Sequence, residues 1–328
     1  MKLLFIGGTG LISSACGNLA LKRSHELFLL NRSSSTKFPA PKNVTILEAD
    51  IHADAAHLSA LLAGHHFDAV VDFIAFSPND IERDISIFRD KTDQFVFISS
   101  ASAYQKPPQN YLITEETPLE NPYWEYSRNK IACEDLLMKT YREDGFPVTI
   151  IRPSHTYGPF QMPFTWTLID RMKRSEKVII PGDGTSLWVL TWNDDFAKGL
   201  VGLLGNKDAI GEAFHITSDE VLSWNQIYLE AYQALGLSPN VVRIASDFIA
   251  IYDEHAVGSL IGDKSNSVVF DNSKIKRFVP DYNCEVKWSE GVRRSLAWFE
   301  AHPEFQTIDA ESNLLWDKII SGYEKAFS

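Results

Sequence analysis

Six short apolar segments alternate with amphipathic segments through the first half of the chain, and this alternation constrains the fold more than any other feature. The apolar segments are KLLFI, ELFLL, VTILEA, DAVVDFIAF, QFVFISS and VTIIRP. Several are apolar at consecutive positions, which is typical of strands buried on both faces. Segments with helical spacing lie between most of them, at residues 11–22, 53–62, 78–89 and 123–142. The alternation predicts an α/β fold with a doubly wound, parallel Rossmann sheet.

The pattern changes after residue 152, where helical segments, short strands and aromatic residues dominate. Helical spacing recurs at residues 164–174, 194–204, 224–235 and 291–301. We therefore expect a Rossmann domain at residues 1–160, to which residues 186–205 return. Residues 161–328 should form mainly a smaller, mostly helical C-terminal lobe that binds the substrate.

The composition narrows the classes of function. The net charge of −12 argues against a nucleic-acid surface, because binding to phosphates needs a basic stripe. No apolar run approaches the length of a membrane span. The three cysteines are odd in number and far apart, which favours buried thiols in a reducing compartment and a cytoplasmic protein. The spacing of the histidines predicts no metal site.

A glycine-rich turn follows the first strand directly. KLLFI runs into Gly7-Gly8-Thr9-Gly10 and then into a helical segment that starts with Leu11 and Ile12. Unpaired N–H groups and the helix dipole favour a phosphate at a helix N-terminus, and glycine lets the backbone approach it closely. The alternative is an ordinary βα turn, but the position after the first strand favours a dinucleotide site.

A serine, a tyrosine and a lysine are candidates for the chemistry. Tyr126 and Lys130 stand four residues apart in YSRNK, a spacing that places both on one face of a helix. Asn121 and Pro122 are expected to be the N-cap and the first residue of that helix. Ser100 ends the strand QFVFISS, at the sheet edge where ligands bind in parallel α/β folds. A Tyr–Lys pair alone is usually a solvated helix face, and the serine and the glycine turn together favour catalysis.

These motifs resemble the extended short-chain dehydrogenase/reductase family, which includes sugar-nucleotide epimerases and dehydratases. The family's GxxGxxG turn falls on Gly7, Gly10 and position 13, where this chain has Ser13. Serine is small, so we expect a slightly displaced helix and retained binding. The likeness covers about residues 1–235 well and the remainder loosely.

The resemblance implies an enzyme in which Tyr126 is the acid or base for the substrate hydroxyl. It implies that Lys130 holds the cofactor ribose and lowers the pKa of the tyrosine, and that Ser100 hydrogen-bonds the reacting oxygen. A free tyrosine ionises near pH ~10, and a neighbouring cation favours the phenolate that proton abstraction requires.

The second strand ends in Asn31-Arg32-Ser33, without the carboxylate that an NAD-selective site offers to the ribose. Arg32 and Ser33 fit a ribose 2′-phosphate, which predicts NADP, with NAD as the alternative if Arg32 is only solvated. The resemblance places further cofactor contacts at Asp50, which meets the adenine amine, and at Ile51, Ala75 and Pro153.

Three positions on the substrate side differ from sugar-nucleotide enzymes. The asparagine and the arginine that contact the nucleotide diphosphate in that group align with His155 and Trp188. The Asp-Glu pair of the 4,6-dehydratases aligns with Ala101-Ser102, so dehydration by that route is not expected. We take Ser102, His155 and Trp188 as candidate substrate contacts. The aromatic residues of the lobe form either a pocket or, more simply, a packed core: Phe160, Phe164, Trp166, Trp188, Trp192 and Trp224.

The leading hypothesis is an NAD(P)-dependent oxidoreductase or epimerase that acts on a hydroxyl or carbonyl of a small polar, sugar-like substrate. The alternative is a non-catalytic dinucleotide-binding regulator or RNA-associated protein, as some relatives of the family are. The resemblance also implies a homodimer through two helices. Its apolar contacts would be Ile81, Ile85 and Phe88 on one helix and Ile131 and Met138 on the other, unless these residues only pack on the sheet.

Overall fold

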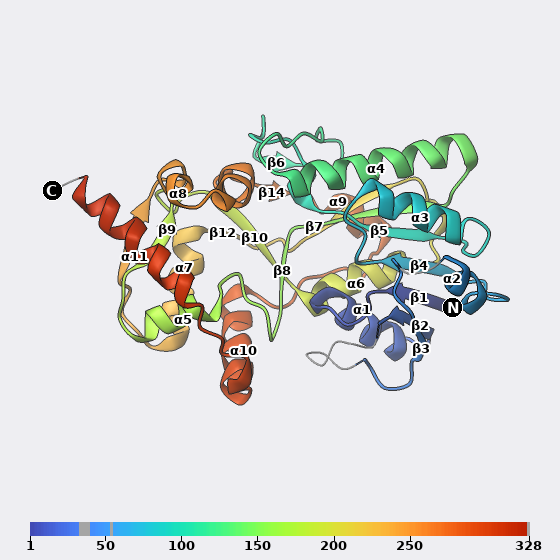
Figure 1. Cartoon of the computed structure of the whole chain (residues 1–328), viewed down its shortest axis with the longest axis horizontal. Helices are drawn as coiled ribbons and strands as arrows, with labels where there is room; N and C mark the ends of the chain where they lie inside the picture. The colour runs from blue at the N-terminus through green and yellow to red at the C-terminus, as the bar shows by residue number, and fades with distance from the viewer. Residues whose placement is uncertain (33–39, 53–54, 327–328) are drawn as a thin grey trace.

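A seven-stranded parallel sheet forms the larger part of the molecule in the computed structural model, which describes residues 1–32, 40–52 and 55–326 (Figure 1). The strand order is β11-β7-β5-β4-β1-β2-β3. The strands are β1 (Lys2–Ile6), β2 (Glu26–Asn31), β3 (Thr45–Glu48), β4 (Ala69–Asp72), β5 (Phe95–Ile98), β7 (Val148–Pro153) and β11 (Ala213–Ile216). The prediction of a doubly wound Rossmann sheet is confirmed.

Helices cover both faces of this sheet, which explains the continuous apolar runs of its strands. Helices α1 (Leu11–Lys22) and α6 (Asn193–Leu203) lie on one face, and α3 (Pro78–Phe88) and α4 (Glu125–Asp144) lie on the other (Figure 1). Because side chains alternate along a strand, Leu3 and Phe5 of β1 join the core under α1 and α6. Leu4 and Ile6 join the core under α3 and α4.

The smaller part of the molecule combines short sheets with helices. One sheet has the order β12 (Val221–Ser223), β10 (Leu187–Trp192), β8 (His155–Tyr157), and two pairs join β13 (Val241–Ile244) to β9 (Val178–Pro181) and β14 (Val269–Phe270) to β6 (Leu112–Ile113). The helices are α5 (Trp166–Lys173), α7 (Trp224–Leu235), α8 (Ser246–Tyr252), a π-helix (Val257–Lys264), α10 (Trp288–Ala301) and α11 (Ala310–Lys325), whereas α9 (Ser273–Phe278) packs on β11 and α6 of the larger part. Trp166, Trp188, Trp192 and Trp224 are buried in this part, so packing explains most of its aromatic residues.

The chain passes between the two parts more than once. Helix α6 packs on α1, whereas β10, which precedes it, pairs with β8 and β12 and not with the main sheet. Strand β11 then adds the seventh strand beside β7. We keep the division into residues 1–160 with 186–205 and residues 161–328 as a proposal, to which β11 adds a second returning segment.

Helix α4 begins later than the sequence suggests. Trp124 is its N-cap, so the prediction that Asn121 and Pro122 start the helix is wrong. The Asn121 side chain is buried, and its Nδ2 donates to the carbonyl oxygens of Ser102 and Gly262, at 2.9 and 2.8 Å. Two remote backbone acceptors thus hold Asn121 outside the helix, where it joins the two parts of the molecule.

The apolar side of α3 is not available to a partner. Ile81, Ile85 and Phe88 are buried in the core between α3 and the sheet, so the prediction that they form dimer contacts is wrong. Ile131 and Met138 of α4 are partly buried. Within the described residues, no helix is both long and apolar enough to cross a membrane, and no group of three metal-binding side chains occurs.

Two carboxyl groups lie buried together where β4 ends. Asp72 Oδ1 accepts from the N–H groups of Ile74 and Ala75, at 2.6 and 2.9 Å, and so shapes the loop that follows the strand. Oδ1 of Asp84, in α3, accepts from Arg83, whereas Oδ2 of Asp72 and Oδ2 of Asp84 are buried without a hydrogen-bond partner among the described residues. Burial, and next the charge of Asp72, hold the pKa of Asp84 well above its usual range. Two carboxylates buried side by side repel each other, so the fold favours the protonated, neutral form of Asp84.

We predict that Asp84→Asn stabilises the protein at neutral pH. An amide at this position carries no charge, can still accept from Arg83 and can donate to Asp72, so it removes the charge repulsion and a cost of about 1–3 kcal/mol for a buried unpaired oxygen. Because the pKa of Asp84 is raised on folding, its contribution to stability is full below the unfolded value of ~4 and is lost as the pH rises through the raised pKa. Thermal melts of both proteins at a series of pH values should show this loss of stability with rising pH in the parent alone.

The matched control is Asp90→Asn, an exposed aspartate just beyond the same helix. It should leave the pH profile of the melting temperature unchanged. Parallel profiles for the parent and Asp84→Asn would show that folding does not raise the pKa of Asp84.

Candidate active site and cofactor cleft

Only glycine fits at two positions of the glycine turn. Gly7 has φ +80°, and a Cβ added there would lie 2.4 Å from Ile74 Cγ2. A Cβ on Gly8 would lie 2.4 Å from Leu29 Cδ2. The turn therefore fits tightly between β2 and the loop after β4, and helix α1 begins at Leu11, directly after it.

Ser13, which stands where the family has its third glycine, stabilises the turn. Its Oγ accepts from the Gly10 N–H at 2.8 Å and donates to the Gly7 carbonyl at 2.9 Å. The Ser13 side chain is buried, so these bonds are shielded from water. The serine thus adds two hydrogen bonds that a glycine cannot make, and the turn is retained.

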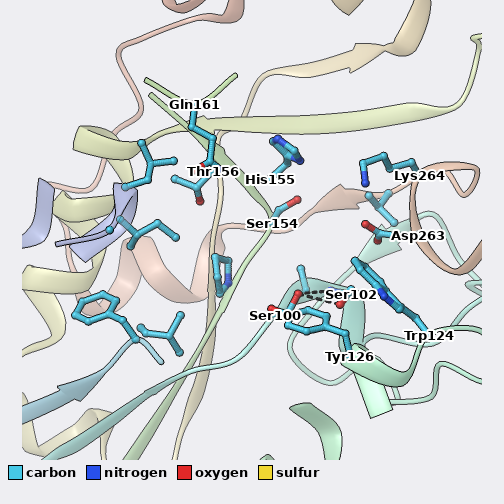
Figure 2. Close-up of a pocket in the computed structure, with 18 of the residues that line it drawn as sticks. Ser100, Ser102, Trp124, Tyr126, Ser154, His155, Thr156, Gln161, Asp263 and Lys264 are labelled. Carbon is cyan, nitrogen blue, oxygen red and sulfur yellow. Dashed lines mark hydrogen bonds between the residues drawn. The ribbon is translucent and has the colours of Figure 1, made fainter. Parts of the chain in front are cut away.

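Two cavities meet at this turn, and Gly7, Gly10 and Ile74 line both. One, of about 700 Å³, extends past Asn31, Arg32, Asp50 and Ile51. The other, of about 560 Å³, extends past Leu11, Ile12, Ser100, Tyr126 and Pro153 (Figure 2). Cavities on either side of a turn at a helix N-terminus fit the two halves of a dinucleotide with its pyrophosphate between them.

Arg32 and Asp50 lie together at the mouth of the first cavity. Arg32 Nη1 is 3.7 Å from Asp50 Oδ2, and the arginine side chain is 69% exposed. Exposed pairs of this kind contribute little to stability, so either side chain can turn to a ligand. Ser33, the third residue expected at this site, lies outside the described residues.

Three serines form a short hydrogen-bonded chain beside Tyr126. Ser100 Oγ lies 2.9 Å from Ser102 Oγ, and Ser127 Oγ donates to Ser102 Oγ at 2.7 Å. Ser100 and Ser102 lie next to Tyr126 on one side of the cavity (Figure 2). These bonds fix the Ser100 hydroxyl, and no motif in the sequence predicts that Ser127 takes part in them.

The pKa of Tyr126 is raised, mainly by burial, and a hydrogen bond with Ser100 offsets part of the rise. The expectation that Lys130 lowers this pKa is wrong for the arrangement seen here. Lys130 Nζ lies 5.8 Å from the centroid of the Tyr126 ring and donates instead to two carbonyl oxygens. The phenol of Tyr126 therefore carries its proton at neutral pH.

Lys130 joins helix α4 to the ends of two strands. Its Nζ donates to the carbonyl oxygens of Ala75, after β4, and Ile98, in β5, both at 2.7 Å. Burial lowers the pKa of Lys130 to about 8, so the ammonium form prevails at neutral pH. Ala75 and Lys130, both expected to contact the cofactor, line neither cavity, and Lys130 reaches the second cavity only through its bond to Ile98, which lines it.

The substrate side of the cavity contains more charge than the sequence suggested. His155 and Trp188 line it, as expected, and burial lowers the pKa of His155 to about 3, which leaves its ring neutral. Sequence reasoning missed further lining residues at this side: Lys106, Trp124, Asp263 and Lys264. They come from segments far apart in the chain, and no motif marks them.

A sequence profile of the NAD dependent epimerase/dehydratase family matches residues 3–217. The chain belongs to this family. The resemblance drawn from the glycine turn and the Ser–Tyr–Lys residues is thereby confirmed, and so is the expectation of an NAD(P)-dependent enzyme at the level of the family. The profile ends at residue 217, after β11, so it leaves out the π-helix and the C-terminal helices.

Two curated relatives are similar over most of this chain. The chloroplast stem-loop binding protein of 41 kDa b of Arabidopsis thaliana is 25% identical over 74% of this chain, and the match spans 65% of that protein. An uncharacterized UDP-glucose epimerase of Bacillus subtilis is 28% identical over 67% of this chain and 78% of its own length.

Solved structures share the fold. A UDP-glucuronic acid 4-epimerase from Bacillus cereus, in complex with UDP-glucuronic acid and NAD, has a TM-score of 0.74 and 21% identity over 92% of this chain and 99% of its own. A dTDP-glucose 4,6-dehydratase from Bacillus anthracis in complex with NAD has a TM-score of 0.75 and 18% identity over 93% and 98%. The family and these neighbours support dependence on NAD and give no support to NADP as the main cofactor.

Proposed function

We propose that this protein is a nicotinamide-dependent epimerase or oxidoreductase that acts on a hydroxyl or carbonyl group of a small, polar, sugar-like substrate. The observation that carries the proposal is the cavity shared by the glycine turn, Ser100 and Tyr126, whose lining residue Ile98 accepts from Lys130. A cofactor bound at the turn would supply the hydride acceptor or donor beside the tyrosine. Gly7, Gly10, Leu11 and Ile12 would hold its pyrophosphate.

The tyrosine and the serine would handle the proton. Tyr126 keeps its proton on Oη at neutral pH, so it can donate to a substrate carbonyl oxygen and take a proton back from a hydroxyl in the reverse direction. The Ser100 hydroxyl, held by Ser102, would hydrogen-bond that same oxygen. An epimerase needs both directions at one carbon, and these residues suffice for both.

Lys130 would hold the cofactor ribose and keep the strand ends in place. Its two carbonyl partners fix the ammonium at the junction of β4, β5 and α4. A third N–H of the ammonium remains to donate to a ribose hydroxyl.

The decisive experiment is the exchange of Tyr126 for phenylalanine. Tyr126→Phe should fold and bind NAD like the parent, since one hydroxyl is lost, and turnover should fall by at least ~10²-fold. Lys130→Met should weaken NAD binding as well as turnover, and Ser100→Ala should lower turnover alone. Turnover is to be measured on a panel of sugars, sugar nucleotides and ketones, and NAD binding by calorimetry.

Tyr123→Phe is the matched control, because Tyr123 is an exposed tyrosine three residues away. It should retain the parent rate. If Tyr126→Phe turns over substrate as fast as the parent, Tyr126 is not the proton-transfer residue. That result would favour the non-catalytic alternative.

We further propose that Arg32 makes the protein bind NADP more tightly than NAD, with NAD as the alternative that the solved neighbours favour. Among the described residues, Arg32 has one exposed ion pair, with Asp50, and a 2′-phosphate offers it stronger charge-assisted bonds. Calorimetry should show that Arg32→Ala loses about 10-fold or more in affinity for NADP and little for NAD. Arg23→Ala, at the exposed end of α1, should change neither. A preference for NAD in the parent would contradict the proposal.

The alternative function is a dinucleotide-binding regulator or RNA-associated protein. The name of the Arabidopsis relative, a stem-loop binding protein, favours it. The net charge of −12 opposes it, because RNA binding depends on basic surfaces. A gel-shift assay with a stem-loop RNA, run beside the turnover panel, separates the two functions.

The homodimer remains a prediction, now limited to the outer faces of α3 and α4. Sedimentation at micromolar concentration should show a dimer, and Met138→Glu should dissociate it, because a buried carboxylate in an apolar interface is costly. Leu229→Glu, at an exposed leucine of α7, is the control and should leave the mass unchanged. A monomeric parent protein would rule the dimer out.

A further inference from the structure

The substrate side of the cavity has a corner of three charged residues, Lys106, Asp263 and Lys264, which we call the cationic corner. Of the described residues that line this cavity, these are the charged ones. Two ammonium groups and one carboxylate give the corner a net charge of +1, in a chain whose net charge is −12. A local positive charge in an acidic protein attracts anions to that place.

The π-helix that supplies two of these residues is fixed directly on the start of the catalytic helix. A Cβ added to Gly258 would lie 2.5 Å from Trp124 Cδ1, and one added to Gly262 would lie 2.9 Å from Tyr123 Cβ. Asn121 ties the Gly262 carbonyl to that of Ser102. Asp263 and Lys264 consequently lie on the same side of the cavity as Trp124, close to Tyr126 and Ser102 (Figure 2).

The charges of the cationic corner are only partly compensated. Lys106 is 3% exposed, and its Nζ lies 3.6 Å from Asp263 Oδ1, longer than a good charge-assisted hydrogen bond. Burial lowers the pKa of Lys106 and raises that of Asp263. Lys264 Nζ donates to the Ser259 carbonyl at 3.3 Å. Two ammonium groups therefore retain donors for a further partner.

Unpaired polar atoms of buried residues lie around the same cavity. Trp188 Nε1, Thr156 Oγ1 and His155 Nε2 are buried without a hydrogen-bond partner, and all three residues line the cavity. Trp188 and Thr156 are more than nine-tenths buried. Buried polar atoms are normally paired, so these point to a ligand that supplies the missing bonds.

We propose that the cationic corner binds an anionic substituent, a carboxylate or a phosphate, of a sugar-like substrate whose reacting carbon lies at Tyr126. The proposal rests on the function proposed above and names the substrate class for that site. Lys106 and Lys264 would pair with the anion, and Asp263 would hold Lys106 toward it. The neutral Trp188, Thr156 and His155 would hydrogen-bond its oxygens or the neighbouring hydroxyls.

The test is calorimetry on the NAD-saturated protein, which needs no turnover. The probes are glucuronate and glucose 6-phosphate as anions, glucose as their neutral match, glucosamine as a cation and UDP-glucuronate as a nucleotide sugar. We expect at least one of the free anions to bind about 10-fold or more tightly than glucose. Glucuronate and glucose 6-phosphate distinguish a carboxylate from a phosphate as the favoured group.

Lys264→Met should remove that preference while affinities for glucose and NAD stay unchanged. Because Lys106→Met alone leaves Asp263 buried and unpaired, the double variant Lys106→Met/Asp263→Asn is used, and it should lose the preference too. Lys139→Met, at an exposed lysine of α4, should retain it.

Equal binding of glucose and both anions, a preference for glucosamine, or an anion preference that survives both variants would overturn the proposal. So would UDP-glucuronate binding that is tighter than that of either free anion and insensitive to both variants. A failure of the proposed function is recognised separately, by absent binding of both NAD and NADP or by a fully active Tyr126→Phe.

Discussion

The geometry of the site depends on the ammonium group of Lys130. It donates to the carbonyl oxygens of Ala75 and Ile98 and so joins the C-terminal ends of two adjacent parallel strands to one helix. One turn later on the same face of α4, Glu134 accepts from Arg152 of β7 at 2.6 Å and from Ser99. Residues four apart on α4 thus hold three neighbouring strand ends, β4, β5 and β7.

This arrangement brings the candidate cofactor-binding and catalytic residues to one edge of the sheet. Parallel strands end at the same edge, so the glycine turn after β1, the loop after β4 and Ser100 after β5 all face one cavity. The loop after β4 is shaped by Asp72, whose buried neighbour Asp84 lies on α3. The core between the sheet and helices α3 and α4 therefore supports the loop on the cofactor side of the site. Substitutions in this core should alter the affinity for the cofactor.

The smaller part of the molecule closes the site and gives it charge. Asn121 connects the turn at Ser102 to the π-helix, and glycines at 258 and 262 let that helix pack on Tyr123 and Trp124. π-helical segments are rare and are frequent at functional sites. The cationic corner therefore lies next to the start of the helix that carries Tyr126, and an anion bound there would orient the substrate for reaction.

The sheet, most of its helices, the glycine turn and the places of Ser100, Tyr126 and Lys130 on their elements could be predicted from the sequence. These depend on local periodicity and on spacing within one strand, turn or helix, which the sequence displays directly. The tertiary structure alone decided the start of α4, where remote carbonyl groups hold Asn121, and the burial of Ile81, Ile85 and Phe88 under the sheet. It also decided the raised pKa of Tyr126 and the meeting of Lys106 with Asp263, because burial and contact between residues 157 positions apart depend on how the whole chain packs.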